Sequence, residues 1–166
     1  MNKKVLIFTD GSCYNKTKQG GFGVYMQFKD GLHVIAEKKI SKGYSNTTIS
    51  RMELRAIIVA LRNIKIKTAY PILLVSDSEY TINSINKGWL LNWEREGFVG
   101  RKNSDLWKEF LKVWRTFPQN QIKFIHTRGH SKGKDVFQYG NDMADKLASF
   151  RNFTDFELDQ IDYETI

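Results

Sequence analysis

Two aspartates directly follow segments that have the composition of buried strands. Asp10 comes after residues 4–9, which are mostly β-branched or apolar, and Asp77 comes after residues 71–76. Two strands that end in Asp at the same relative position bring both carboxylates to one edge of a sheet, where ligands bind in open α/β proteins. Taken singly, each aspartate is equally explained as a residue that begins a turn or caps a helix.

Further acids lie on segments whose apolar spacing predicts helices. Glu53 borders the apolar face of one helix, and Asp142 and Asp145 lie three residues apart near the start of the last one. Each has a structural alternative. Glu53 closes a capping box with Ser50, and the helix dipole favours acids in a first turn.

Taken together, the acids predict a metal site. Clustered carboxylates repel one another unless cations neutralise them. Asp and Glu oxygens without Cys or several His suit Mg²⁺ or Mn²⁺ better than Zn²⁺. Two such ions, ~3.5–4 Å apart, activate a water and stabilise the leaving oxygen of a phosphodiester. The acids therefore indicate metal-dependent phosphodiester hydrolysis.

The composition is that of one globular domain. Of 166 residues, 41% are hydrophobic and 27% charged, which is enough apolar material for a core. The single cysteine, Cys13, excludes an internal disulfide. The chain lacks a secretory apolar region near its start and any run of ~18 apolar residues. We therefore expect a cytoplasmic protein without a membrane partner.

The charge is unevenly distributed. The last 16 residues hold one Arg and five acids, a net charge of −4. Because the whole chain carries +8, residues 1–150 carry +12. We therefore predict a domain over residues 1–150 followed by an acidic C-terminal tail, 151–166. A body this basic favours nucleic acid as a partner, although solubility alone explains part of the charge. An acidic site in a basic body is typical of a metal-dependent nuclease.

The apolar patterns predict an α/β sheet covered by helices. The residues after Asp10, 11–21, are predicted as a loop, and the aromatic face of the helix near 106–117 is predicted as core. The predicted strands are 4–9, 22–28, 32–40, 71–76 and 121–127, and the predicted helices begin near residues 50, 78, 105 and 141.

The motifs, in their order, resemble those of a type-1 ribonuclease H, and the similarity runs from Val5 to about Ala148. They are Phe8-Thr9-Asp10-Gly11-Ser12-Cys13, Gly20-Gly21-Phe22-Gly23, Thr47-Thr48, Arg51-Met52-Glu53-Leu54, Ser76-Asp77-Ser78, Trp89, Asn92-Trp93, Asp105-Leu106-Trp107, Arg128-Gly129-His130 and the stretch from Asn141 to Ala148. The resemblance implies a ribonuclease H-like fold: a mixed five-stranded sheet with helices on both faces, in the order β-β-β-α-β-α-β-α.

The resemblance also implies the metal ligands. They are Asp10, Glu53, Asp77 and Asp145, which would hold two Mg²⁺ ions, with Mn²⁺ as a substitute. Asp142 competes for the fourth place, but the closing pattern of the family, Asn, three residues, Asp, one residue, Leu-Ala, fits Asp145.

Further functional residues are implied in the same way. His130 matches a loop histidine that assists proton transfer or product release, although a His after a Gly is also explained as a solvated loop residue. Thr48 would lie in a pocket for a DNA-strand phosphate, Trp93 would line the DNA channel, and Asn103 would face the minor groove. The full predicted substrate-binding set is Cys13, Asn15, Thr48, Glu79, Trp93 and Asn103.

The chain departs from the family pattern near the expected substrate groove. Ile49 stands where an Asn is common, Asn15 is shifted by one position, and Glu79 replaces a usual Gln. Lys132 and Lys134 are a candidate source of compensating charge. These changes concern affinity and cleavage-site preference rather than the chemistry.

The predicted function is that of an endonuclease that hydrolyses the RNA strand of RNA–DNA hybrids and leaves 5′-phosphate and 3′-hydroxyl ends. Two alternatives stay open: another nuclease of this fold, such as a resolvase or exonuclease, and a hybrid-binding module without catalysis. The expected partner is the hybrid, and the expected oligomeric state is a monomer.

Overall fold

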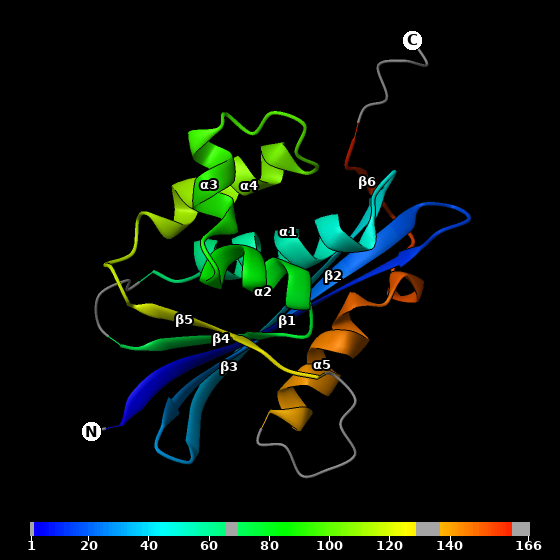
Figure 1. The fold of residues 1–166 in the computed structure, drawn as a ribbon. Coiled ribbons are helices and arrows are strands. Elements are labelled where there is room, and N and C mark those ends of the chain that lie inside the picture. Colours follow the sequence, from blue (N-terminus) through cyan, green and yellow to red (C-terminus); the bar gives the residue numbers. More distant parts are fainter. Residues whose placement is uncertain (1, 66–69, 129–136, 161–166) are drawn as a thin grey trace.

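The computed structural model describes residues 2–65, 70–128 and 137–160, and its centre is a long antiparallel meander (Figure 1). The meander consists of β1 (Lys3–Tyr14), β2 (Gln19–Asp30) and β3 (His33–Ser45). The turn between β2 and β3 contains the Asp-Gly pair, and Gly31 takes the positive φ of 56° that such a turn favours. β2 and β3, whose positions match two of the predicted strands, therefore form a hairpin.

Two parallel strands extend the sheet beyond β1. β4 (Ile72–Ser76) pairs with β1, and β5 (Ile122–His126) pairs with β4. The sheet is therefore mixed, with the order β5-β4-β1-β2-β3-β6. The predicted ribonuclease H-like α/β fold is confirmed, and the five expected strands gain a short sixth, β6 (Glu157–Leu158), which pairs parallel to the end of β3.

The helices cover both faces of the sheet, as predicted (Figure 1). Cores form on the two faces: one lies under the first four helices, and the other includes Phe8, Val75 and Ala144 under the last. The first four are α1 (Ile49–Arg62), α2 (Glu79–Asn86), α3 (Trp89–Arg95) and α4 (Ser104–Trp114), and the opposite face carries α5 (Gln138–Ala148), followed by the 3-10 turn η1 (Phe150–Asn152).

The predicted loop at residues 11–21 is wrong for most of its length. β1 continues to Tyr14 and β2 begins at Gln19, so only the turn between them is not strand. The glycines that suggested a loop are instead sites of close packing. A Cβ atom on Gly21 would lie 2.8 Å from the carbonyl oxygen of Ala148. The missing side chain at Gly21 lets α5 pack closely against β2, and it does not serve backbone flexibility.

The capping box expected at the start of α1 is also absent. Thr48, not Ser50, is the N-cap, and its hydroxyl accepts a 3.3 Å hydrogen bond from the backbone N–H of Arg51. Glu53 is therefore released from capping.

The aromatic face of α4 is core, as predicted. Trp107 and Phe110 are 2% and 0% exposed, and their rings meet edge to face with centroids 5.8 Å apart. Within the described ranges, no helix has the length and apolar character needed to cross a membrane.

Candidate active site

Strand register brings the two aspartates together, although only Asp77 follows the end of its strand, because β1 continues past Asp10 to Tyr14. Thr9 of β1 is opposite Ser76 of β4 in a parallel ladder, so Asp10 and Asp77 follow at neighbouring positions where that ladder ends. Glu53 of α1 joins them, and one carboxylate oxygen from each of the three lies within 4.8 Å of the others. The structure therefore assembles three of the four predicted metal ligands.

Gly11 allows Glu53 to reach this edge. A Cβ atom at Gly11 would lie 2.5 Å from the backbone nitrogen of Glu53 and 2.8 Å from the carbonyl carbon of Met52. Only a residue without a side chain lets the first turns of α1 pack so closely against β1. The backbone N–H of Gly11 also donates a 2.9 Å hydrogen bond to Oδ1 of Asp10 and orients that carboxylate.

The electrostatics of the cluster favour a cation. Burial, and then the Asp77 carboxylate, raise the pKa of Asp10 to about 7. Burial, with Asp10 and Asp77 next to it, raises the pKa of Glu53 well above its usual value. Glu53 is 5% exposed, and its Oε2 has no hydrogen-bond partner among the described residues. A buried oxygen without a donor, among repelling carboxylates, fits a divalent metal with oxygen ligands.

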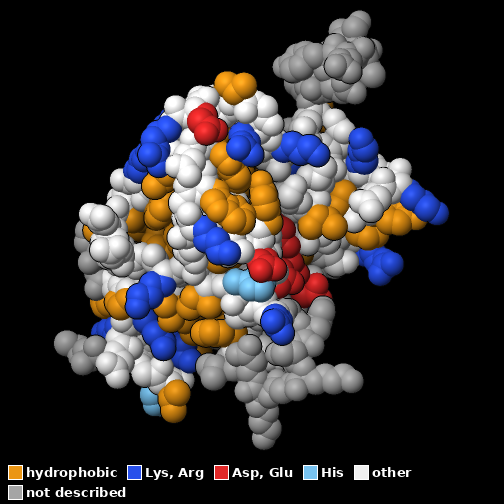
Figure 2. Space-filling model, in the orientation of Figure 1, with side chains coloured by type: hydrophobic (Ala, Val, Ile, Leu, Met, Phe, Trp, Pro, Cys, Tyr) orange, Lys and Arg blue, Asp and Glu red, His pale blue; other side chains and the backbone are white. Residues whose placement is uncertain are grey.

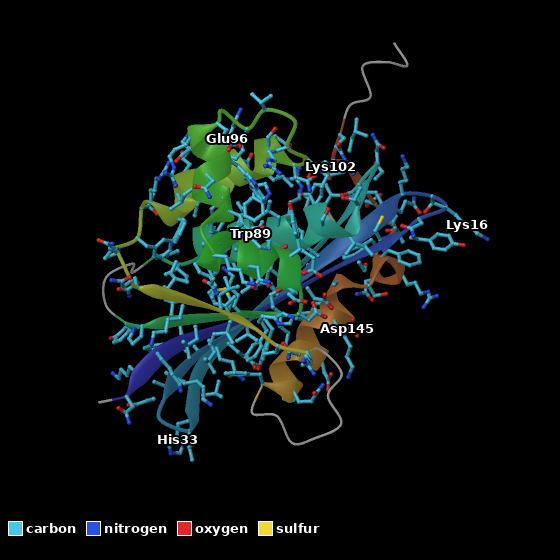
Figure 3. The ribbon with its side chains drawn as sticks, viewed as in Figure 1. Lys16, His33, Trp89, Glu96, Lys102 and Asp145 are labelled. Atoms are coloured by element: carbon cyan, nitrogen blue, oxygen red, sulfur yellow. The ribbon has the colours of Figure 1, made fainter. Side chains whose placement is uncertain are left out.

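Asp145 approaches the cluster from the opposite face of the sheet. It is exposed on α5, beside the ends of the central strands (Figure 3), and its carboxyl contributes to the raised pKa of Asp10 through a side-chain hydrogen bond. Asp142 points elsewhere, because its Oδ1 accepts a 2.8 Å hydrogen bond from Gln138. Of these two acids, the structure thus gives Asp145 the interaction with Asp10.

Two glycines set the position of α5. A Cβ atom at Gly23 of β2 would lie within 3.0 Å of the backbone at Ala144 and Ala148, and one at Gly140 would overlap the ring of Phe8. The helix therefore packs directly on the strands, which fixes the height of Asp145 above Asp10.

One hollow is lined by two of the acids, and a second shares Thr48 and Ser50 with it. The first, of about 560 Å³, is lined by Glu53 and Asp77 together with Asn15, Thr48, Ile49 and Tyr80. The second, of about 720 Å³, is lined by Lys18, Asn46, Thr48, Ser50, Lys102, Asn103 and Gln160. Figure 2 shows several acidic side chains gathered in one patch, with Lys and Arg side chains spread around it. This arrangement is suited to a polyanion whose backbone reaches bound metal ions.

The predicted substrate residues lie in different environments. Thr48 belongs to both hollows, whereas Asn15 lines the first and Asn103 the second. Cys13 is half-buried, and burial raises the pKa of its thiol, which donates to the carbonyl oxygen of Thr47 at 3.5 Å. Glu79 is exposed at the start of α2.

Trp93 lies mostly in the core. It is 6% exposed, and its ring stacks on Tyr80 with centroids 6.2 Å apart. The more accessible aromatic rings of this group are Tyr80, 51% exposed, and Trp89, 37% exposed. Tyr80 is not among the residues predicted from the sequence, although its position three residues after Asp77, in the first turn of α2, would have indicated it.

Some predictions lie outside the described residues. His130, Lys132 and Lys134 fall within residues 129–136.

Of the basic and amide residues of the second hollow, only Asn103 is among those predicted from the sequence. Lys18, Asn46, Lys102 and Gln160 are far apart in the sequence, and no motif joins them.

Comparisons with known proteins agree with this site. The ribonuclease H (RNase H) family model matches residues 2–151. The ribonuclease H of Syntrophomonas wolfei subsp. wolfei is 37% identical over 151 residues, which cover 88% of this chain and 94% of that protein. The ribonuclease H of Actinobacillus succinogenes is 38% identical over 153 residues, 89% of each chain.

A solved structure is similar as well. The solution structure of the PFV RNase H domain superposes with a TM-score of 0.71 at 27% identity, over 89% of this chain and 93% of that domain. With the family model matching nearly the whole chain and the acid cluster assembled, the chain belongs to the ribonuclease H family.

Proposed function

We propose that this chain hydrolyses the RNA strand of RNA–DNA hybrids with two Mg²⁺ ions, or Mn²⁺ in their place, held by Asp10, Glu53, Asp77 and Asp145. As a member of the ribonuclease H family it is an enzyme, a metal-dependent nuclease. The observation that carries the proposal is the cluster of three carboxylates within 4.8 Å, in which one oxygen of Glu53 is buried without a partner among the described residues.

The chain itself supplies the charge and the rigidity of the site. Bound divalent ions supply an activated water and stabilise the leaving oxygen. Glu53 is fixed by its place on α1 against Gly11, and Asp10 by its hydrogen bond from the same glycine. Because these acids are held in place before a substrate arrives, little reorganisation is needed during the reaction. The expected products carry 5′-phosphate and 3′-hydroxyl ends.

The surrounding residues are proposed to recognise the hybrid. Thr48 is assigned to a DNA-strand phosphate, and Asn103, which lines the same hollow, is assigned to the minor groove. Cys13 and Asn15 are assigned to the minor-groove side, where 2′-hydroxyl groups distinguish RNA from DNA.

Glu79 and Trp93 are assigned to the edge of the DNA channel. Tyr80 is added to them because it is the exposed ring of this group. His130 is assigned to proton transfer or product release. A monomer, a cytoplasmic location and the domain boundary at residue 150 stay predictions.

Cleavage of one sequence in four forms tests the function. The substrates are the RNA–DNA hybrid, double-stranded RNA, double-stranded DNA and a four-way junction, each with Mg²⁺, with Mn²⁺ or with EDTA. We expect cleavage of the hybrid alone, only with metal, and its loss in Asp10→Asn.

Other outcomes point to the alternatives. Cleavage of the junction or of DNA would assign the chain to a different nuclease activity of this fold. Tight hybrid binding without cleavage in either metal would make it a binding module. Calorimetric titration of Mg²⁺ and Mn²⁺ into the protein, with and without uncleavable hybrid, counts the ions.

A further inference from the structure

We propose that the C-terminal segment 153–160 is part of the substrate-binding face, and that Asp159 is a positioning residue that fixes Thr48 and Asn103 through Arg51. The inference rests on the proposed function and deepens it, because it assigns a role in hybrid binding to a segment that the sequence marks only as an acidic tail.

The segment is held on the domain by packing and by backbone pairing. The ring of Phe153 lies on Gly21 and Gly43, and a Cβ atom on Gly43 would come within 2.8 Å of it. The strand β6 then pairs with the end of β3, and the backbone N–H of Asp159 donates a 3.0 Å hydrogen bond to the carbonyl oxygen of Ser45. Asp159 is thereby brought beside the start of α1.

The Asp159 carboxylate is the centre of a buried ionic network. Its side chain is 0% exposed, and it forms ion pairs with Arg51 and Arg55. It accepts hydrogen bonds from Nε of Arg51 at 2.7 Å and from the hydroxyl of Thr47 at 2.6 Å. Burial alone would raise the pKa of Asp159, but the hydrogen bonds from Arg51, Thr47 and Arg55 hold it below its usual value. A carboxylate buried with two cations keeps its charge and fixes their geometry.

Arg51 connects Asp159 to the residues that line the second hollow. Its guanidinium, 3% exposed, donates two hydrogen bonds to Asp105, at 2.9 and 2.7 Å, and one of 3.4 Å to Oδ1 of Asn103. The amide of Asn103 donates in turn to Ser50 at 3.2 Å, and the Ser50 and Thr48 hydroxyls are 3.2 Å apart. A continuous series of contacts thus joins the tail carboxylate to Asn103 and to Thr48, the residue assigned to a DNA-strand phosphate.

The hollow has the chemistry of a phosphate site. Its described lining contains two lysines, Lys18 and Lys102, with hydroxyl and amide groups and no acid. The tail also contributes directly, since Gln160 lines the hollow and its carbonyl oxygen accepts a 2.7 Å hydrogen bond from Asn46. The ligand class that suits these groups is a phosphate of a nucleic-acid backbone.

Two physical effects of Asp159 have opposite signs, which makes the proposal testable. By charge alone, removing a carboxylate near an anion site tightens phosphate binding. By positioning, removal leaves the buried Arg51 paired only with Asp105, whose side chain is 65% exposed, so Asn103 loses its fixed orientation and binding weakens. We infer that positioning dominates, because the charge of Asp159 is already neutralised by two arginines.

The test compares Asp159→Asn with Asp155→Asn, a change of equal charge at an exposed position of the same segment. Steady-state cleavage and hybrid binding are measured at one ionic strength, together with thermal melting. We expect Asp159→Asn to raise KM and Kd about tenfold and to leave kcat within about twofold. Asp155→Asn keeps the wild-type KM, and Asp159→Glu, which restores the charge, recovers most of the loss.

Several results would overturn the proposal. An unchanged or lower KM in Asp159→Asn would mean that the tail does not order the pocket. Parallel losses of kcat and melting temperature in both Asp159 variants would make the residue structural only. If Asp159→Asn does not fold, Thr47→Val, which removes one hydrogen bond, carries the test: KM is expected to rise about twofold, and an unchanged KM overturns the proposal.

A failure of the proposed function can be distinguished from a failure of this inference. If the proposed function is wrong, the wild-type chain does not cleave the hybrid. In that case the Kd values of the same variants for the hybrid still decide the role of Asp159.

Discussion

The acid cluster stores electrostatic repulsion that only a metal or protons relieve. Burial and the neighbouring Asp77 raise the pKa of Asp10 from 3.8 to about 7 in the metal-free protein. Folding therefore favours the protonated carboxyl. Its contribution to stability is complete below about pH 4 and is lost as the pH rises through about 7. Without metal, the folded state is weakened at the pH at which the enzyme needs its carboxylates ionised.

Asp10→Asn tests this repulsion. In EDTA, we expect the melting temperature of the wild type to fall between about pH 5 and about pH 8, with a smaller fall in the variant. At about pH 8 the variant should melt ~2–4 °C higher, which corresponds to on the order of 1 kcal/mol. Saturating Mg²⁺ should stabilise the wild type and leave the variant nearly unchanged. Identical pH profiles for the two proteins would contradict the account.

The choice between Asp145 and Asp142 is tested by a matched pair of substitutions. Asp145→Asn removes a carboxylate that helps to raise the pKa of Asp10, whereas Asp142→Asn removes one that accepts a hydrogen bond from Gln138. We expect kcat to fall at least about 100-fold in Asp145→Asn, because transition-state charge stabilisation is lost, and less than about fivefold in Asp142→Asn. Cleavage under saturating Mg²⁺ gives both values. Equal losses would show that the two acids share the role.

At the scale of elements, glycines set the distances between helices and strands. Gly11 brings α1 to β1, and Gly23 and Gly140 bring α5 to the other face. The side chains of the site come from these two helices, from Asp10 within β1 and from Asp77 directly after β4. A small shift of either helix therefore displaces a metal ligand even when the fold is retained.

Gly23→Ala tests this coupling. The added methyl meets the backbone of α5 within 3.0 Å, which must move the helix and Asp145 with it. We expect about 1–3 kcal/mol of destabilisation by denaturant unfolding. The fall in kcat should be larger than a simple loss of folded protein explains. Ser41→Ala, at the exposed partner position on β3, is the control and should change neither quantity. A stable variant with full kcat would contradict the close packing.

At the scale of the whole molecule, the basic body surrounds an acidic centre. Residues 1–150 carry a net +12, and the acids of the site lie within that positive surface (Figure 2). The phosphate backbone is then attracted by the positive charge of the whole surface, whereas catalysis takes place at the acid cluster. Hybrid binding should therefore weaken with salt.

A pair of lysine variants separates the local from the general contribution. Lys18→Ala with Lys102→Ala removes the two cations of the second hollow. We expect the slope of log Kd against log salt concentration to fall by about 1–2. Lys4→Ala with Lys29→Ala removes equal charge at the opposite end of the β1–β2 ladder, where these two lysines are paired, and should leave the slope nearly unchanged. Equal effects of the two pairs would remove the phosphate assignment.

The sequence by itself determined the elements and most of the acid site. Apolar segments, helical spacing and motif order predicted the fold class and the place of Asp10, Glu53 and Asp77, because local apolar periodicity and short-range pattern decide these features. The errors at residues 11–21 and at the end of the first strand have the same origin. Glycine is locally typical of a loop, yet Gly11 packs against α1, and Gly21 contacts Phe153 and α5, which lie more than 100 residues away.

Only the tertiary structure decided how distant segments combine. The cap at Thr48 left Glu53 free to turn toward Asp10, and the closeness of Asp145 to Asp10 depends on helix packing. The tail is only a run of negative charge in the sequence, yet in the structure its Asp159 forms ion pairs with Arg51 and Arg55 of α1. Such pairings depend on long-range geometry and on burial, and neither quantity is encoded in the residues next to one another along the chain.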